Sequence, residues 1–146
     1  NKNYVKIEKN KWIKKADIKK LTHKENNFTK IFKKFLNVKY VWGGKTFQGI
    51  DCSALLQIFF CYNNLFYPRD TKDQIKYTKK NSKKRKFKKG DIIFWKGHVA
   101  MCLNSEKLIH AYGPERKVII MPIIETINRI EKTAKLKVKK VSRIKY

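Results

Sequence analysis

Residues 40–56 read YVWGGKTFQGIDCSALL, and this stretch places one cysteine at the start of a buried helix. A glycine turn precedes Asp51, a residue type that commonly begins helices, and residues 54–65 then form a mainly apolar run without Gly or Pro. Because backbone dipoles at a helix N-terminus stabilise negative charge, we expect the Cys52 thiolate to be favoured there. The free N–H groups of the first turn are also suited to hold an oxyanion. The stretch therefore predicts a cysteine nucleophile.

Two downstream histidines are candidates for the base that such a nucleophile needs. His98 opens a predicted strand, His98–Leu103, on a face that it shares with small side chains. His110 lies in the next predicted strand, Leu108–Tyr112. With a turn centred near Asn104, the two histidines are directly opposed, so one imidazole can orient the other. A one-residue slip in register would remove this contact.

The chain resembles the NlpC-type (NlpC/p60) cysteine peptidases, a family of papain-like enzymes that cut bacterial cell-wall peptides. The resemblance rests on motif elements that follow the family's order over most of the chain. These elements are Tyr40–Gly44, Asp51–Ser53, Pro68–Arg69, Gln74, Gly90–Phe94, His98–Val99 and Ile109–Ala111. The chain departs from the family's pattern at Ala54 and Ala100, where glycine is usual. These departures bear on the width of the cleft more than on the chemistry.

By this resemblance, Cys52 is the nucleophile, His98 is the general base and acid, and His110 is the third polar group that holds His98 in its working tautomer. Further residues are implied to lie beside the thiol or to bind substrate. They are Tyr40, Trp42, Asp51, Ser53 and Arg69. The implied reaction is hydrolysis of peptidoglycan stem peptides at the bond between γ-D-glutamate and a diamino acid. A peptidoglycan-derived peptide is therefore the expected partner.

The implied fold is α+β and papain-like, with N-terminal helices, including the nucleophile helix, packed on a mostly antiparallel sheet. Besides the nucleophile helix, helices are predicted at Phe28–Asn37, from Thr71 onward and at Glu125–Lys132. Thr71 and Gln74 have the spacing of a capping box. The predicted strands are Asp91–Trp95, His98–Leu103, Leu108–Tyr112, Val118–Ile123 and one near Val138–Lys145.

Residues 1–21 are expected to form an N-terminal arm, and residues 22–146 a single catalytic domain. Within the arm, Tyr4–Glu8 and Lys11–Lys14 look like two short strands. Residues 12–18 are similar to the closing strand of bacterial SH3-like domains; the alternative is an irregular arm packed on the catalytic domain. Because the chain does not start with Met, we expect a processed product or an excerpt of a longer chain.

The formal net charge of +26, from 37 Lys and Arg against 11 Asp and Glu, would ordinarily suggest a nucleic-acid partner. However, lysines are spread along the chain together with abundant Asn, Ile, Phe and Tyr, a composition that an AT-rich genome explains. No nucleic acid is therefore expected as a partner. The Lys-rich run 79–89 is interpreted as a solvated loop, with binding of an acidic wall polymer or membrane surface as the alternative.

Three cysteines are an odd number, which argues against a complete disulfide framework. Cys52, His98 and His110 lack the close spacing of zinc-ligand pairs, so we expect no metal. A cysteine peptidase, which the resemblance implies, needs no cofactor. No apolar run has transmembrane length, so no membrane span is expected. The sequence gives no oligomeric state. The resemblance favours the bacterial periplasm or cell exterior, with a cytoplasmic recycling role as the alternative.

Two other classes of function fit the same residues. One is an amide or acyl transferase built on the same scaffold, because a cysteine nucleophile forms an acyl intermediate that an amine can also attack. The other is a catalytically silent module that binds the cell wall. A transferase predicts a new conjugate when an amine competes with water, whereas a silent module predicts binding without a reactive thiol.

Overall fold

An antiparallel sheet of five strands, in the spatial order β8-β7-β6-β5-β9, forms the centre of the fold. The computed structural model describes residues 2–78 and 86–143. The strands are β5 (Asp91–Trp95), β6 (His98–Cys102), β7 (Lys107–Tyr112), β8 (Lys117–Pro122) and β9 (Lys140–Arg143). Neighbouring strands pair antiparallel throughout this sheet. The predicted α+β class with a mostly antiparallel sheet is confirmed.

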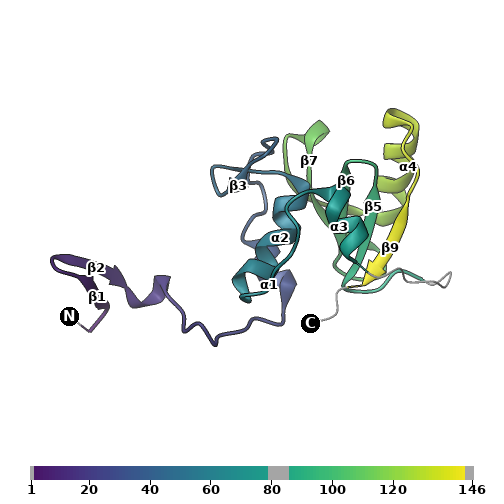
Figure 1. Ribbon diagram of the computed structural model, residues 1–146. Coiled ribbons are helices and arrows are strands. Elements are labelled where there is room, and N and C mark those ends of the chain that lie inside the picture. The colour runs from purple at the N-terminus through teal and green to yellow at the C-terminus, as the bar shows by residue number, and fades with distance from the viewer. Residues whose placement is uncertain (1, 79–85, 144–146) are drawn as a thin grey trace.

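Helices cover both faces of this sheet (Figure 1) because its strands carry apolar side chains on both sides. On one face lie α1 (Phe28–Lys33) and α2 (Cys52–Tyr62), and α2 contacts β6 and β7. On the other face lies α4 (Ile123–Ala134), which packs through Ile123 and Ile130. The helix predicted over Glu125–Lys132 is therefore confirmed, with an additional turn of helix divided between its ends.

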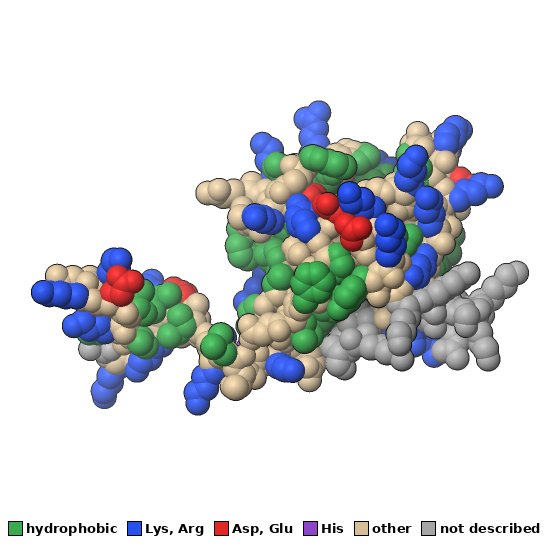
Figure 2. Space-filling view, in the orientation of Figure 1, with side chains coloured by type: hydrophobic (Ala, Val, Ile, Leu, Met, Phe, Trp, Pro, Cys, Tyr) green, Lys and Arg blue, Asp and Glu red, His purple; other side chains and the backbone are tan. Residues whose placement is uncertain are grey.

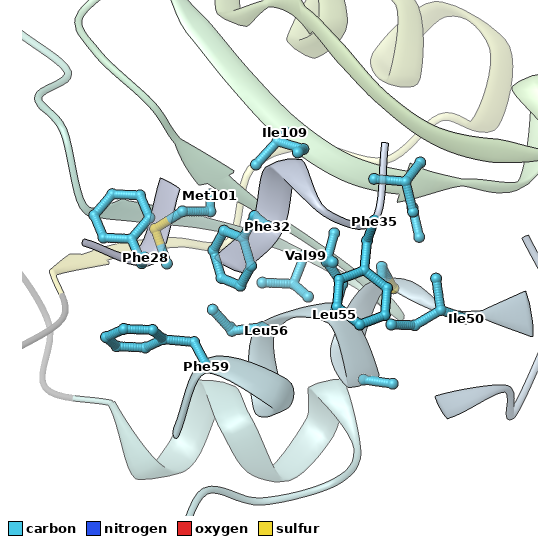
Figure 3. Packing of buried hydrophobic residues seen from close by; sticks show 14 of the residues in the cluster. Phe28, Phe32, Phe35, Ile50, Leu55, Leu56, Phe59, Val99, Met101 and Ile109 are labelled. Atoms are coloured by element: carbon cyan, nitrogen blue, oxygen red, sulfur yellow. The ribbon is translucent and has the colours of Figure 1, made fainter. Parts of the chain in front are cut away.

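Phenylalanine rings dominate the core between the α1–α2 pair and the sheet (Figure 3). Phe28, Phe32 and Phe59 form a cluster with ring centroids 5.7 to 6.2 Å apart. Across from them, β6 and β7 contribute Val99, Met101 and Ile109 to the same cluster. This cluster holds α2 on the sheet, and with it the N-terminal end of that helix.

The first helix is shorter than predicted, since it ends at Lys33 instead of Asn37. The chain leaves the helix through a turn in which Asn37 has a positive φ of 65°, a conformation that Asn tolerates better than most residues. The Asn37 N–H then donates to the Val118 carbonyl at 3.0 Å, and the Val118 N–H donates to Val38 at 2.9 Å. Residues 37 and 38 therefore hydrogen-bond to β8 instead of continuing α1.

The capping box predicted at the start of α3 (Thr71–Tyr77) was wrong. Asp70 is the N-cap residue, so Thr71 already lies inside the helix and makes no cap. The Gln74 side chain, fully buried, instead donates to the carbonyls of Ser53 and Pro68, both at 2.9 Å. Gln74 therefore fastens α3 to the start of α2.

The N-terminal arm contains the two predicted strands, β1 (Tyr4–Glu8) and β2 (Lys11–Lys14), which form an antiparallel hairpin. A short 3-10 helix, η1 (Lys15–Asp17), and an extended connector follow. Figure 1 shows the hairpin apart from the helices and the sheet. The connector is joined to the end of α2 by the Asn64 side chain, which donates to the Leu21 carbonyl at 2.6 Å. A kinship of this arm with SH3-like domains stays a prediction.

Positive side chains are spread over the arm and over the domain in Figure 2, interleaved with hydrophobic and acidic ones. On this face they do not gather into one basic stripe. Residues 79–85, most of the predicted Lys-rich loop, lie outside the described residues. In the part of the chain that the structure describes, no helix combines the length and the apolar character needed to cross a bilayer.

Replacing Phe59 with alanine should lower the free energy of unfolding by about 3 to 5 kcal/mol, because it leaves a cavity where three aromatic rings meet. Urea unfolding followed by circular dichroism measures this loss. Phe66→Ala is the matched control: its ring is 74% exposed, so we expect a loss below about 1 kcal/mol. Equal losses for the two variants would contradict a core centred on Phe59.

Candidate active site

Cys52 is the first residue of α2, as predicted, and its position follows from the tight turn before it. The small hairpin of β3 (Lys45–Thr46) and β4 (Gly49–Ile50) brings Gly44 so close to the Gly49 carbonyl that an added Cβ would lie 2.5 Å from the oxygen. The chain then enters the helix with Asp51 as N-cap, its carboxylate accepting the Ala54 N–H at 2.8 Å. The thiol is consequently buried, at 6% exposure.

Asp51 is also the centre of a hydrogen-bonded ion pair. Arg69 donates to the two carboxylate oxygens at 2.7 and 3.0 Å and to Ser53 Oγ at 2.9 Å, while the Gly43 N–H donates to the same carboxylate at 3.0 Å. Burial alone would raise the pKa of Asp51, but the hydrogen bonds from Arg69 and Ala54 outweigh it and hold this pKa below its ordinary value. Asp51 is therefore a carboxylate at neutral pH.

The Cys52 thiol lies against the chain segment that leads into β6. Its Sγ is 4.0 Å from the Gly97 carbonyl oxygen. Burial raises the pKa of this thiol above its ordinary value; hydrogen bonding from the Val99 backbone and from the Thr71 side chain opposes the rise without cancelling it. Burial therefore works against the stabilisation of the thiolate that was expected from the helix N-terminus, and the net direction is a raised pKa.

His98 and His110 are in contact, with His98 Nε2 and His110 Nδ1 2.9 Å apart. The register differs from the expected one: β6 and β7 pair Met101 with Ile109 and Cys102 with Leu108, so the turn is centred at residue 105. The two histidines are thus diagonal neighbours instead of directly opposed. Moving the centre of the turn by one residue shifts the pairing by two residues. Because side chains alternate with a period of two, both histidines stay on one face of the sheet and the contact between them is kept.

The histidine pair lies in an apolar environment. Tyr112 stacks on the His110 ring with centroids 4.5 Å apart, and the Trp95 ring centroid lies 5.4 Å from that of His98. Burial lowers the pKa of His98 to about 4, and burial together with His98 and Arg129 lowers that of His110 well below its ordinary value. Both rings are neutral at neutral pH.

The Cys52 thiol lies beside Gly97, the residue before His98. Within residues 2–78 and 86–143, no hydrogen bond joins the thiol to His98 itself.

A cleft of about 390 Å³ opens at the thiol. It brings together Cys52 and all of the predicted substrate-binding residues, namely Tyr40, Trp42, Asp51, Ser53 and Arg69. Trp42 is 81% exposed at this cleft. Thr71 and Lys72 line the cleft as well. They were not predicted from the sequence, because the packing of α3 beside the nucleophile turn leaves no signal in the residues around them.

Among the described residues, no group of three His, Cys, Asp or Glu side chains is arranged to hold a metal ion.

A helix that begins at a buried cysteine and packs on an antiparallel sheet is the arrangement of papain-like α+β domains. The comparison with protein families makes the assignment specific. The model of the NlpC/P60 family matches residues 37–136, which is more than half of the chain. The chain therefore belongs to the NlpC/P60 family.

Several relatives support this assignment. The chain is 33% identical to the gamma-D-glutamyl-L-lysine dipeptidyl-peptidase of Bacillus subtilis over 64% of its own length and 34% of the relative's. It is 34% identical to dipeptidyl-peptidase 6 of Lysinibacillus sphaericus over 53% of its own length and 28% of the relative's. A crystal structure of an NlpC/P60 family protein from Bacillus cereus superposes with a TM-score of 0.73 at 27% identity, covering 90% of this chain and 46% of that one. The chain thus spans about a third of the length of these curated relatives.

Replacing Arg69 with methionine should lower the free energy of unfolding at neutral pH by about 1 to 3 kcal/mol, because Asp51 loses its cation. The folded-state pKa of Asp51 lies below its unfolded value, so the stabilisation is present above about pH 4 and is lost as the pH falls through the folded-state pKa. Urea unfolding from about pH 7 to about pH 3 should therefore show a shrinking difference from the native protein.

Arg129→Met is the control for this experiment, because its ion pair with Glu115 is more exposed, at 38% and 32% of the two side chains. We expect a loss below about 1 kcal/mol for that variant. A difference between the native protein and Arg69→Met that stays constant with pH would contradict the assignment of the stabilisation to the Asp51 carboxylate.

The rate at which iodoacetamide alkylates Cys52 should rise steeply only in alkaline solution, because its pKa is raised and His98 is neutral. Mass spectrometry of the Cys52 peptide in a Cys61→Ser background, which removes an exposed thiol, gives the rate at each pH. A rate plateau between about pH 5 and pH 8 would instead indicate a thiolate–imidazolium pair and contradict the neutral resting state.

Proposed function

We propose that this chain is a cysteine endopeptidase that hydrolyses peptidoglycan stem peptides through Cys52, His98 and His110. The observation that carries the proposal is the 2.9 Å contact between His98 Nε2 and His110 Nδ1, on the strand that begins beside the Cys52 thiol. This contact leaves His98 Nδ1 as the nitrogen available to the thiol. A buried thiol at a helix N-terminus with an oriented imidazole nearby is the arrangement that acyl transfer requires.

The mechanism proceeds through a covalent intermediate. Cys52 Sγ attacks the substrate carbonyl while its proton passes to His98 Nδ1, since the resting pair is neutral. N–H groups at the start of α2 stabilise the oxyanion. His98 then protonates the leaving amine as the C–N bond breaks, which leaves a thioester on Cys52. Water attacks the thioester, His98 accepts its proton, and the thiol is regenerated as the C–S bond breaks.

The substrate lies in the cleft at the thiol. We propose that Asp51, Ser53 and Arg69 bind its polar end, and that Tyr40 and Trp42 pack along it. Burial raises the pKa of Tyr40, so its hydroxyl keeps its proton and can donate to the substrate. The scissile bond in this proposal joins γ-D-glutamate to a diamino acid. The name of the Bacillus subtilis relative, a gamma-D-glutamyl-L-lysine dipeptidyl-peptidase, supports this choice.

The same proposal assigns the parts of the chain. Residues 22–146 form the catalytic domain, and residues 1–21 form an arm that is the tail of a bacterial SH3-like domain. The chain on either side of this boundary, at Leu21 and Glu25, is joined through Asn64 and Asn63 to the end of α2, opposite Cys52. The arm is therefore not required for the thiol's own geometry.

The test is mass spectrometry of a defined muropeptide mixture incubated with the native protein and with Cys52→Ala. We expect cleavage after D-glutamate by the native protein and none by the variant, because the sulfur forms the intermediate. Cys61→Ala is the matched control: its thiol lies exposed near the other end of the same helix, and its loss should leave cleavage unchanged. Cleavage that persists in Cys52→Ala would refute the proposal.

The same reaction separates the two alternatives. With glycine amide present, a transferase would yield a mass that carries the added amine, whereas a hydrolase yields mainly the free acid. A silent wall-binding module would leave every muropeptide intact while the folded protein still retained muropeptides on a column. Either result would replace the endopeptidase proposal.

A further inference from the structure

The second ring nitrogen of His110 has an unusual neighbour. His110 Nε2 lies 3.4 Å from the sulfur of Met121, and both side chains are nearly inaccessible to solvent, at 1% and 6% exposure. The strand register explains the contact. Ile119 of β8 pairs with His110, so Met121, two residues further on, is on the same face in the diagonal position. This face of the sheet is the one that α4 covers.

A thioether sulfur carries lone pairs but no hydrogen, so it can only accept a hydrogen bond. A proton on His110 Nε2 is satisfied by this contact, whereas an unprotonated Nε2 would face another lone pair. Because a neutral imidazole carries one N–H, His110 Nδ1 is then unprotonated and must accept. Its partner, His98 Nε2, must therefore donate across the 2.9 Å contact.

The proton on His98 Nε2 also fixes the state of the other ring nitrogen of His98, Nδ1. With its proton on Nε2, a neutral His98 has a free lone pair on Nδ1, the tautomer that a general base needs. We propose that Met121 is a positioning residue that sets the tautomers of both histidines, so that His98 Nδ1 is the free base. The consequence for catalysis rests on the proposed function; the tautomers themselves do not.

A thioether suits this position better than a carboxylate would. A carboxylate would favour the charged imidazolium and raise the pKa of His110, whereas the weakly accepting sulfur orients the N–H without stabilising a charge. The surroundings agree with a neutral ring. Tyr112 stacks on His110, and the Arg129 guanidinium lies 5.5 Å from the Tyr112 ring centre, so the nearby charge is positive. Glu115 pairs with Arg129 at 2.7 Å, and Arg129 still contributes to holding the pKa of His110 below its ordinary value.

The direct test is nitrogen-15 NMR of the histidine rings in the labelled native protein near neutral pH, where long-range coupling spectra distinguish protonated from unprotonated ring nitrogens. We expect His110 and His98 both to be protonated at Nε2 and unprotonated at Nδ1. Protonation of His110 at Nδ1 in the native protein would overturn the proposal. This readout needs no substrate, so a failure of the muropeptide reaction with the expected tautomers would refute the proposed function alone.

The functional test uses the chain's two methionines as a matched pair. Met121→Leu keeps the bulk and removes the acceptor; kcat should fall about tenfold with little change in KM, because the required tautomer then buries an unpaired N–H. Its NMR spectrum should show His110 with a proton on Nδ1. Met101→Leu, equally buried but in the cluster on the α2 face, should change neither readout. Native-like tautomers and kcat in Met121→Leu would overturn the proposal.

Discussion

The Asp51 carboxylate is the interaction on which the rest of the site depends. It caps α2 through Ala54, accepts Arg69 through both oxygens and holds the Gly43 N–H, so it joins the glycine turn, the nucleophile helix and the start of α3 at one point. A buried carboxylate is tolerated only when it is paired and hydrogen-bonded, and here both of its oxygens accept hydrogen bonds. The position of the thiol relative to β6 follows from this junction, since Cys52 is the next residue.

Burial gives the site its second constraint. The phenylalanine core draws α2 tightly onto the sheet and buries the Cys52 thiol, while on the opposite face Tyr112 and Met121 pack against the buried His110. Burial disfavours the charged forms, the thiolate of Cys52 and the imidazolium of each histidine. The resting site therefore holds a neutral thiol and neutral imidazoles. Proton positions then depend on hydrogen-bond geometry instead of charge. A weak acceptor such as the Met121 sulfur can matter in that setting, because within the described part of the chain it is the hydrogen-bond partner of His110 Nε2.

The two faces of the sheet have different roles in this arrangement. The face toward α1 and α2 carries the aromatic core that places the nucleophile helix. The face toward α4 carries His110 with Tyr112 and Met121, the side chains that surround the histidine ring. Because side chains alternate along β7, these two roles fall on different residues of one strand. A substitution among the side chains around His110 therefore leaves the packing of α2 on the other face unchanged.

The sequence by itself determined the elements and the residues of interest. Short apolar runs bounded by turn residues, and alternation from His98 onward, located the strands from residue 91 to residue 122 to within a residue or so. Asp51 before an apolar run located the start of the nucleophile helix. These features are local, because strand periodicity and helix capping depend on residues a few positions apart. The tertiary structure decided the register that makes His98 and His110 diagonal, the use of Gln74 as a tie between helices, the raised pKa of the thiol and the contact with Met121. Each of these depends on which distant residues exclude water or supply a partner, and that information exists only once the chain has packed.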